Sequence, residues 1–376
     1  MKLKLDLSKA YGLVLEGGGA KGSYQIGAWK ALREAGITIE GVAGASVGAL
    51  NGAMVCMDDL ETAEYLWENI SYSKVMDVDD SVMESVRNRD LKALNMSLLV
   101  SEAKKVLKDK GFDITPLREL IGSAIDEEKI RTSPRELYIT TYSLSDRQLL
   151  TVDAKELPPG EIGDMLMASA YLPVFKTEKL GGKRYLDGGG FDNVPVGALL
   201  ERGYEDIIII RIYGLGFDSE KVTQIPEGTR VYHIAPRQNL GGILEFDKKL
   251  AAKNMRLGYF DAHRLLYGLE GRWYYLDADL SEEDCFGQLA GRWERLEPLL
   301  PAEFSEESKN REEDGLRYFT EYLFPALARQ WKMKEDWNYR DLYLGILEYA
   351  ARSRRINRFK IYTPQELLEK IYLHDI

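Results

Sequence analysis

A strand–turn–helix unit that occurs twice near the N-terminus restricts the fold of this chain more than any other feature. The apolar segment 11–16 runs into the glycine-rich loop 17–22, and residues 23–35 follow with helical spacing. A second β-prone segment, 37–43, enters the turn GASVG, and the small, apolar residues 47–57 follow like a buried helix. Strands that alternate with helices in this way predict an α/β fold with a mainly parallel central sheet.

The remainder of the chain divides into three stretches. Residues 71–131 are charged and amphipathic, which predicts a helical insertion and makes it a candidate lid. Strand patterns then return at 136–143, 148–152, 183–186, 206–212 and 229–234. The β-branched residues of the last two predict strands that are buried on both faces. After residue 239 every pattern is helical, and TPQE at 363–366 predicts a capped helix start.

Charge and cysteine content restrict the partners and the compartment. The 376 residues carry a net charge of −11, which opposes non-specific binding to nucleic acid and whole-body attraction to anionic lipid. Only Cys56 and Cys285 occur as cysteines, so neither a disulfide framework nor a cysteine-based zinc site is expected. The N-terminus lacks the apolar segment of a secretory signal, and the longest β-rich apolar run, 207–210, is far shorter than the roughly 20 residues that cross a bilayer. We therefore expect a cytoplasmic protein that contacts a membrane, if at all, only at the surface.

The turn GASVG suits a serine nucleophile. A serine at a tight strand-to-helix turn needs small neighbours because the backbone is crowded there, and Gly44 and Gly48 permit such a turn around Ser46. The following helix directs its N–H groups and the positive end of its dipole at the site, where they stabilise developing negative charge. Taken alone, the pattern also fits a glycine-rich turn that merely precedes a helix.

The first glycine-rich loop, GGGAKG, can bind an anion through its backbone. Three consecutive glycines let N–H groups turn toward the anion and leave no Cβ in the way of a substrate. In an acyl hydrolase that anion is the tetrahedral oxyanion. We expect Gly18 and Gly19 to be the best donors, with Gly17 and Ala20 beside them.

The same loop has a second interpretation. The pattern GxGxxG from Gly17 to Gly22, between a strand and a helix, also marks dinucleotide-binding folds, and Glu40 follows at the distance of a ribose-binding carboxylate. A dinucleotide-binding oxidoreductase is therefore an alternative, although the strand pattern continues past Glu40 and such an enzyme has no use for a second turn of small residues. A Walker loop is excluded because no Gly-Lys-Ser/Thr occurs there. Lys21 either adds charge to the site or lies at the surface.

A third motif, DGG, follows a short strand pattern at Asp187. Gly188 and Gly189 leave space around the carboxylate. In isolation the motif also fits a simple turn, because aspartate before glycine commonly bonds its own backbone. Together with the glycine-rich loop and the serine turn, in this order along the chain, it makes Asp187 a candidate catalytic residue.

In their order and spacing along the chain, the three motifs resemble those of the patatin-like phospholipases, which have a glycine-rich oxyanion loop, a GxSxG turn and a distant DGG or DGA. The stretches ASAYLP at 168–173 and DNVPV at 192–196 also look like the family's segments around the aspartate. The resemblance covers about residues 8–275 and leaves 280–376 as a helical C-terminal region. It implies a three-layer sandwich whose mainly parallel sheet is flanked by helices. One departure is Glu16, where the family implies a small or different acidic residue, and it bears on substrate fit.

The resemblance implies a serine acyl hydrolase that cleaves carboxylic ester bonds of lipids or phospholipids through a Ser–Asp dyad. Ser46 attacks the ester carbonyl, Asp187 takes the proton, an acyl-enzyme forms, and no metal or other cofactor takes part. Because an aspartate of ordinary pKa is a weak base, the site must be desolvated or rely heavily on the oxyanion loop. A Ser46–Asp187–His233 triad of the α/β-hydrolase kind stays an alternative, since the three residues occur in that order. A non-catalytic scaffold is opposed by the three intact motifs.

Several segments bear on membrane contact. The insertion and the C-terminal helices are candidate lipid-docking surfaces. A basic run with two apolar residues among its members is either a contact for anionic lipid headgroups or a solvated helix face. It consists of Arg352, Arg354, Arg355, Ile356, Arg358, Phe359 and Lys360. The acidic stretch 303–314 is the one segment whose composition is typical of disorder.

Overall fold

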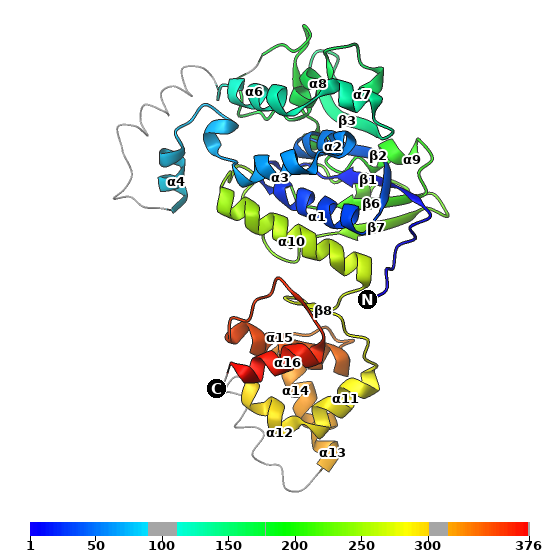
Figure 1. Ribbon diagram of the computed structural model, residues 1–376, viewed down its shortest axis with the longest axis vertical. Helices are drawn as coiled ribbons and strands as arrows, with labels where there is room; N and C mark the ends of the chain where they lie inside the picture. Colours follow the sequence, from blue (N-terminus) through cyan, green and yellow to red (C-terminus); the bar gives the residue numbers. More distant parts are fainter. Residues whose placement is uncertain (89–110, 177, 301–314, 375–376) are drawn as a thin grey trace. The chain divides into compact units, whose positions relative to one another are not determined.

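A seven-stranded sheet organises the larger part of the computed structural model, which describes residues 1–88, 111–176, 178–300 and 315–374. The strands are β1 (Ala10–Leu15), β2 (Thr38–Ala45), β3 (Glu136–Ser143), β4 (Gln148–Asp153), β5 (Tyr185–Asp187), β6 (Asp206–Ile210) and β7 (Arg230–Ile234). Their order is β4-β3-β2-β1-β6-β7, with β5 paired to β3 (Figure 1). All pairs are parallel except β3 with β4 and β3 with β5. The prediction of an α/β fold with a mainly parallel sheet is confirmed.

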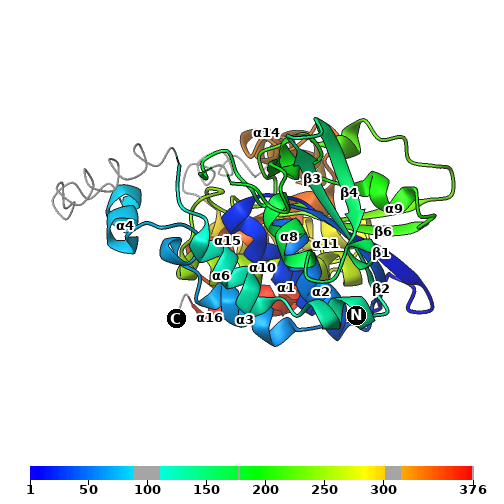
Figure 2. The same ribbon diagram turned by 90° about the horizontal axis from the view of Figure 1, so that it is seen from above.

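Helices cover both faces of this sheet and give the expected three layers (Figure 2). On one face Val14, Ala43 and Ile209 pack with Leu199 of α9 (Val196–Leu200) in a single buried cluster. On the other face α2 (Val47–Met57) lies so close that a Cβ at its Gly52 would stand 3.0 Å from Val42. The helices of this part are α1 (Ser23–Glu34), α2 (Val47–Met57), α3 (Leu60–Glu68), α4 (Asp80–Asn88), α6 (Thr115–Ala124), α7 (Glu127–Thr132), α8 (Ile162–Ser169), α9 (Val196–Leu200) and α10 (Lys248–Tyr267).

Helices α1 and α10 pack side by side at backbone contact (Figure 1). A Cβ at Gly27 would lie 1.8 Å from the carbonyl oxygen of Met255, and one at Gly258 would lie 1.9 Å from that of Tyr24. Only glycine fits at either position. This packing fixes the segment before α10, which touches the glycine-rich loop.

The edge of the sheet departs from the sequence prediction. Strand β6 is buried along its whole length, as expected for a strand between two neighbours. The prediction that the last strand is buried on both faces is wrong, because Arg230 and His233 of β7 are exposed. The physical reason is that β7 ends the sheet and has one neighbouring strand. Helices α4, α6 and α7 lie in the insertion 71–131, whose residues 89–110 are outside the described residues.

The chain divides into two units, one of residues 4–266 and one of residues 1–3 with 267–376. The second unit is mainly helical, as predicted after residue 239, but it also holds a parallel two-stranded pair. Its elements are β8 (Tyr275–Leu276), α11 (Glu282–Gly291), α12 (Trp293–Leu296), α13 (Gly315–Tyr318), a π-helix (Phe319–Leu323), α14 (Phe324–Gln330), α15 (Tyr339–Ser353), β9 (Ile361–Tyr362) and α16 (Pro364–Leu373). The acidic stretch 303–314 lies outside the described residues.

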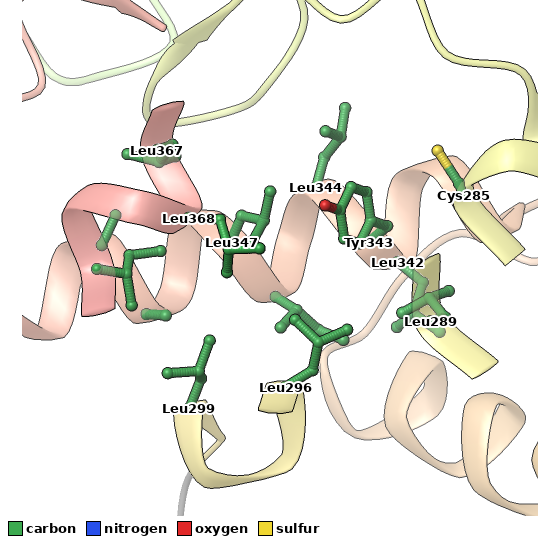
Figure 3. Close-up of a cluster of buried hydrophobic side chains, with 14 of the residues drawn as sticks. Cys285, Leu289, Leu296, Leu299, Leu342, Tyr343, Leu344, Leu347, Leu367 and Leu368 are labelled. Atoms are coloured by element: carbon green, nitrogen blue, oxygen red, sulfur yellow. The ribbon is translucent and has the colours of Figure 1, made fainter. Parts of the chain in front are cut away.

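The second unit has its own apolar core. Figure 3 shows Leu289 of α11, Leu296 of α12, Leu347 of α15 and Leu367 of α16 converging in it, and all four are buried. The predicted helix start at Thr363 is confirmed, since its side chain and that of Glu366 form a reciprocal capping box. Such a cap is worth about 1 kcal/mol of helix stability.

Candidate active site

Ser46 occupies a strained turn between β2 and α2. Its φ of 54° and ψ of −129° are rare for a residue with a side chain, and such strain costs on the order of 1–3 kcal/mol. The turn exists only because its neighbours lack side chains. A Cβ at Gly44 would lie 2.4 Å from the carbonyl carbon of Gly48, and one at Gly48 would lie 2.1 Å from the carbonyl oxygen of Leu15. The sequence prediction that both glycines permit the serine turn agrees with this geometry.

The register of β3 brings Asp187 to Ser46. Thr140 pairs with Ala45, the last residue of β2, and Thr141 pairs with Asp187, the last residue of β5. Strand β5 therefore takes the place beside β3 that β2 leaves when the chain turns at Ser46. Gly188 makes room for the approach, because a Cβ there would lie 2.3 Å from the carbonyl oxygen of Thr140.

Ser169 at the end of α8 ties the serine turn to the sheet. Its hydroxyl accepts a hydrogen bond from the N–H of Ser46 at 2.9 Å and donates one to the carbonyl of Thr140 at 2.6 Å. Ser169 is fully buried. The sequence stretch around it was singled out only by resemblance, and a fully buried serine gives no signal of this role in the sequence.

The two candidate catalytic side chains are in direct contact. The Ser46 hydroxyl donates to Oδ2 of Asp187 at 2.5 Å, and Oδ1 accepts from the N–H of Gly189 at 2.8 Å. Ser46 is 6% exposed and Asp187 is 8% exposed. Burial raises the pKa of Asp187 to about 6, and the hydrogen bonds from Ser46 and Gly189 oppose that rise. This is the desolvation that a carboxylate base requires.

Two of the four expected oxyanion donors are already engaged. The N–H of Gly17 donates to the carbonyl of Asn193 at 3.1 Å, and the N–H of Ala20 donates to the carbonyl of Ile243 at 2.8 Å. The side chain of Asn193 also donates to the carbonyl of Gly17 at 3.1 Å. The expectation that Gly17 and Ala20 bind the oxyanion stays a prediction, and these two hydrogen bonds favour Gly18 and Gly19 over them as donors.

The N–H groups of Gly18 and Gly19 differ from those of Gly17 and Ala20. Within the described part of the chain neither group donates to an acceptor. Both residues line the same cavity as Ser46 and Asp187. Gly19 also has a φ of 55°, and a Cβ on it would lie 2.1 Å from the carbonyl oxygen of Ile243. These two amides are therefore the candidate oxyanion donors.

Lys21 and Gly22, the last two residues of the glycine-rich loop, contact neighbouring segments and hold the loop in place. The ammonium group of Lys21 donates to the carbonyl of Tyr213 at 2.6 Å, and desolvation lowers the pKa of Lys21. The charge of Lys21 is thus directed at a backbone carbonyl of the loop after β6. Gly22 lets the loop approach α2, since a Cβ there would lie 2.4 Å from Cγ2 of Val47.

Glu16 holds the loop after β6 against the glycine-rich loop. It is 2% exposed, and its Oε2 accepts from the N–H groups of Ile212 at 2.6 Å and Tyr213 at 3.0 Å. Arg211 adds an ion pair to Oε2 at 3.0 Å, and the N–H of Gly214 donates to Oε1 at 3.2 Å. Glu16, the departure from the family pattern, thus anchors the loop after β6 as a buried carboxylate. From the sequence alone, this departure was expected to affect substrate fit.

Two cavities meet at Ser46. One is apolar, encloses about 830 Å³ including the space at its mouth, and extends between α2, α3 and α6. Its lining includes the apolar side chains of Leu50, Trp67, Leu117, Ile121, Phe175 and Phe246. The other cavity opens beside Asp187 and is lined by Pro173, Phe191 and Leu215. Because α6 belongs to the insertion 71–131, the described part of that insertion forms a wall of the apolar cavity.

The triad alternative does not fit this structure. A triad needs an imidazole between the hydroxyl and the carboxylate, but Ser46 donates directly to Asp187. The imidazole of His233 lies on the edge strand, where it contacts the carboxylate of Glu220. The dinucleotide alternative is weakened too, because β2 continues beyond Glu40 to Ala45.

Comparison with known proteins agrees with the three motifs. A family model described as patatin-like phospholipase matches residues 13–200, half of the chain. Neuropathy target esterase sws of Drosophila sechellia is 57% identical over 47 residues, which are 12% of this chain and 3% of that protein. Lysophospholipase nte1 of Aspergillus terreus is 54% identical over 50 residues, 13% of this chain and 3% of that protein.

This chain thus spans only a small fraction of the curated relatives that it matches. Among solved structures, VipD from Legionella pneumophila aligns with 97% of this chain and 86% of its own at 15% identity and a TM-score of 0.44. The family match includes the glycine-rich loop, the serine turn and the DGG motif. The chain belongs to the patatin-like phospholipase family.

Proposed function

We propose that this protein hydrolyses carboxylic ester bonds of lipids, with Ser46 as the nucleophile and Asp187 as its base. The observation that carries the proposal is the 2.5 Å contact between the Ser46 hydroxyl and the Asp187 carboxylate, both nearly buried, at the meeting point of two cavities. Family membership and the match to an esterase and a lysophospholipase support the same chemistry.

The first half of the reaction forms an acyl-enzyme. Ser46 Oγ attacks the ester carbonyl carbon while its proton passes to Asp187 Oδ2, and the negative charge moves to the former carbonyl oxygen. The N–H groups of Gly18 and Gly19 stabilise that oxyanion, and each such donor is worth about 2.7–4 kcal/mol. When the tetrahedral intermediate collapses, the bond to the alcohol breaks and Asp187 returns the proton to the leaving oxygen.

The second half releases the fatty acid. Asp187, again ionised, takes a proton from a water molecule whose oxygen attacks the acyl carbonyl carbon. The same two amides stabilise the second oxyanion. Collapse breaks the bond to Ser46 Oγ, which regains a proton from Asp187. The raised pKa of Asp187, about 6, makes it a better base than an exposed aspartate while leaving it ionised at neutral pH.

The two cavities suggest how a lipid ester is oriented. The apolar cavity suits the acyl chain, because its walls consist mainly of apolar side chains, many of them from α2, α3 and α6. The second cavity, beside Asp187, then receives the alcohol part of the ester, where the returned proton is needed. We propose this orientation for lipid substrates in general, without a choice of headgroup.

Narrowing the apolar cavity is expected to change acyl-chain preference. Ala124 of α6 lines the cavity, so Ala124→Phe should lower kcat/KM for long-chain esters at least about tenfold relative to short-chain esters. Ser123→Phe is the matched control, since Ser123 is exposed on the same helix and adds the same ring outside the cavity. The measurement is kcat/KM across a series of p-nitrophenyl esters. An unchanged ratio in Ala124→Phe would contradict the proposed acyl site.

A fluorophosphonate probe tests the proposed nucleophile. Such a probe phosphonylates an activated serine, and mass spectrometry of the digested protein should place the label on Ser46. Ser46→Ala should remove both the label and the hydrolysis of a soluble short-chain ester. Labelling at another serine, or full hydrolysis by Ser46→Ala, would overturn the proposal. Tight binding of NAD without any labelling would favour the dinucleotide alternative.

We also propose that contact with a membrane is confined to its surface. In the described ranges no helix combines the length and the apolar character that crossing a bilayer requires. The structure makes the basic run near the C-terminus a weaker candidate for that contact than the sequence pattern indicated, because two of its residues are engaged within the second unit. Its Ile356 is buried, and the guanidinium of Arg352 lies 4.1 Å from the ring centre of Trp273 in the same unit.

A further inference from the structure

We propose that the mouth of the cavity at Asp187 docks on the surface of a lipid aggregate through a ring of exposed apolar side chains. This inference rests on the proposed function and names the physical form in which the substrate reaches the site. The ring, called the apolar rim below, consists of Val174, Phe191, Tyr213, Leu215 and Phe217. Their exposed fractions run from 38% for Val174 to 76% for Leu215.

Three chain segments bring the rim together around one opening. Phe191 and Leu215 line the cavity that also contains Ser46 and Asp187. The N–H of Phe217 donates to the carbonyl of Gly189 at 3.0 Å, which places Phe217 next to the DGG turn. Val174 directly follows Pro173, another residue of the cavity wall. Phe191 and Leu215 therefore lie at the entrance to the site, Val174 and Phe217 lie next to its wall in the chain fold, and Tyr213 belongs to the same loop as Leu215.

The rim is held in its exposed position. The ring of Phe191 stacks on Tyr142 with centres 3.8 Å apart and planes 10° apart. Tyr213 has a φ of 48°, a left-handed conformation that a bulky residue rarely adopts. Its N–H is bound to the buried carboxylate of Glu16, which fixes the backbone of this loop from below. A loop that places apolar side chains in water under backbone strain is typical of an interaction surface.

The chemistry of the rim favours a lipid surface without net charge. The net charge of −11 opposes attraction to anionic lipid, so binding must come from burial of apolar groups. Insertion of apolar side chains into an interface depends weakly on salt, whereas contacts between cations and headgroups weaken strongly as salt rises. The rim therefore predicts binding to zwitterionic vesicles that persists at high ionic strength.

Vesicle flotation with the full chain tests the rim. In a Ser46→Ala background, which prevents lipid turnover, the protein is mixed with phosphatidylcholine vesicles at about 50 and about 500 mM salt, where the Debye length is roughly 14 and 4 Å. The rim variant is Val174→Asp with Phe217→Asp, since neither residue lines either of the two cavities at Ser46. We expect it to lose at least about tenfold in vesicle binding, while raising salt changes the binding of the parent protein less than about twofold.

Leu7→Asp is the matched control. Leu7 is 52% exposed and precedes the first residue of β1, whereas the site lies beyond the last residue of that strand. It should bind vesicles like the parent protein. Val174→Ser with Phe217→Ser is a second rim variant. It should also weaken vesicle binding if the loss of binding follows from lost apolar area and not from added charge. With Ser46 restored, both rim variants should hydrolyse a soluble short-chain ester at the parent rate and lose hydrolysis of vesicle lipid.

The outcomes separate the rim from the proposed function. Vesicle binding by both rim variants that equals binding by Leu7→Asp overturns the inference, even when the soluble ester is cleaved normally. Binding that disappears at high salt overturns it as well. If vesicle binding depends on the rim but no variant cleaves the soluble ester, the docking surface stands and the proposed hydrolase fails.

Discussion

Asp187→Asn is expected to lower kcat for a soluble ester by about 10³–10⁴-fold with little change in KM. Asparagine keeps the shape of aspartate and can still accept a hydrogen bond from Ser46, but it cannot take the proton in the transition state. The substrate cavity stays the same, so ground-state binding is retained. Steady-state kinetics on a p-nitrophenyl ester measure the effect. His233→Ala is the control and should keep kcat within about twofold, because His233 contacts Glu220 and not the dyad.

The pH dependence of kcat/KM is the second readout of this variant. Asp187 acts as a base only when it is ionised, and burial raises its pKa to about 6. The rate should therefore be constant well above pH 6 and fall about tenfold per pH unit below it. In Asp187→Asn the residual rate should lack that titration. A normal rate in Asp187→Asn together with a large loss in His233→Ala would reverse the assignment and restore the triad.

Glu16→Ala is expected to lower the free energy of unfolding by about 3 kcal/mol and to reduce kcat at least about tenfold. The substitution leaves the N–H groups of Ile212, Tyr213 and Gly214 without their acceptor, and each buried unpaired group costs about 1–3 kcal/mol. Arg211 keeps Asp218 and Glu220 as partners, which limits the loss. The loop after β6 then no longer supports the glycine-rich loop, so Gly18 and Gly19 are held less firmly at the oxyanion position.

Urea denaturation and kinetics on the same preparations measure both effects. Glu40→Ala is the matched control, because Glu40 is an exposed carboxylate on β2 and its removal should change stability by less than about 0.5 kcal/mol. Glu16→Gln should fall between the two, since its amide oxygen can still accept from the backbone while the ion pair with Arg211 is lost. Stability of Glu16→Ala equal to that of Glu40→Ala would contradict the anchoring role.

Local pattern was enough to predict the α/β class with a mainly parallel sheet and to locate the three motifs. Strand, turn and helix alternate between residues 11 and 57, and each change in the spacing of the apolar residues can be read from neighbouring positions in the sequence. The strained turn at Ser46 was predictable because its cause, the lack of side chains at Gly44 and Gly48, lies within the motif itself. The capping box at Thr363 is local in the same sense, since its two partners are three residues apart.

Resemblance added the pairing of Ser46 with Asp187, which no local pattern contains. The two residues are 141 positions apart, and between them lies the insertion of residues 71–131. What brings them together is the register of β3, where Thr140 and Thr141 pair with the ends of β2 and β5. A shift of one residue in that register would turn the Asp187 side chain to the opposite face of the sheet.

Taken by itself, the sequence determined the α/β class, the strained serine turn and the chemical types of the site residues, because these depend on neighbours along the chain. Only the tertiary structure decided which amides of the glycine-rich loop lack an acceptor, what Glu16 binds and that His233 contacts Glu220 and not Ser46 or Asp187. Those properties depend on acceptors from distant segments, such as Asn193 for Gly17 and Ile243 for Ala20. A hydrogen bond is made or lost over a few tenths of an ångström, and distances between remote segments are set only when the whole core packs.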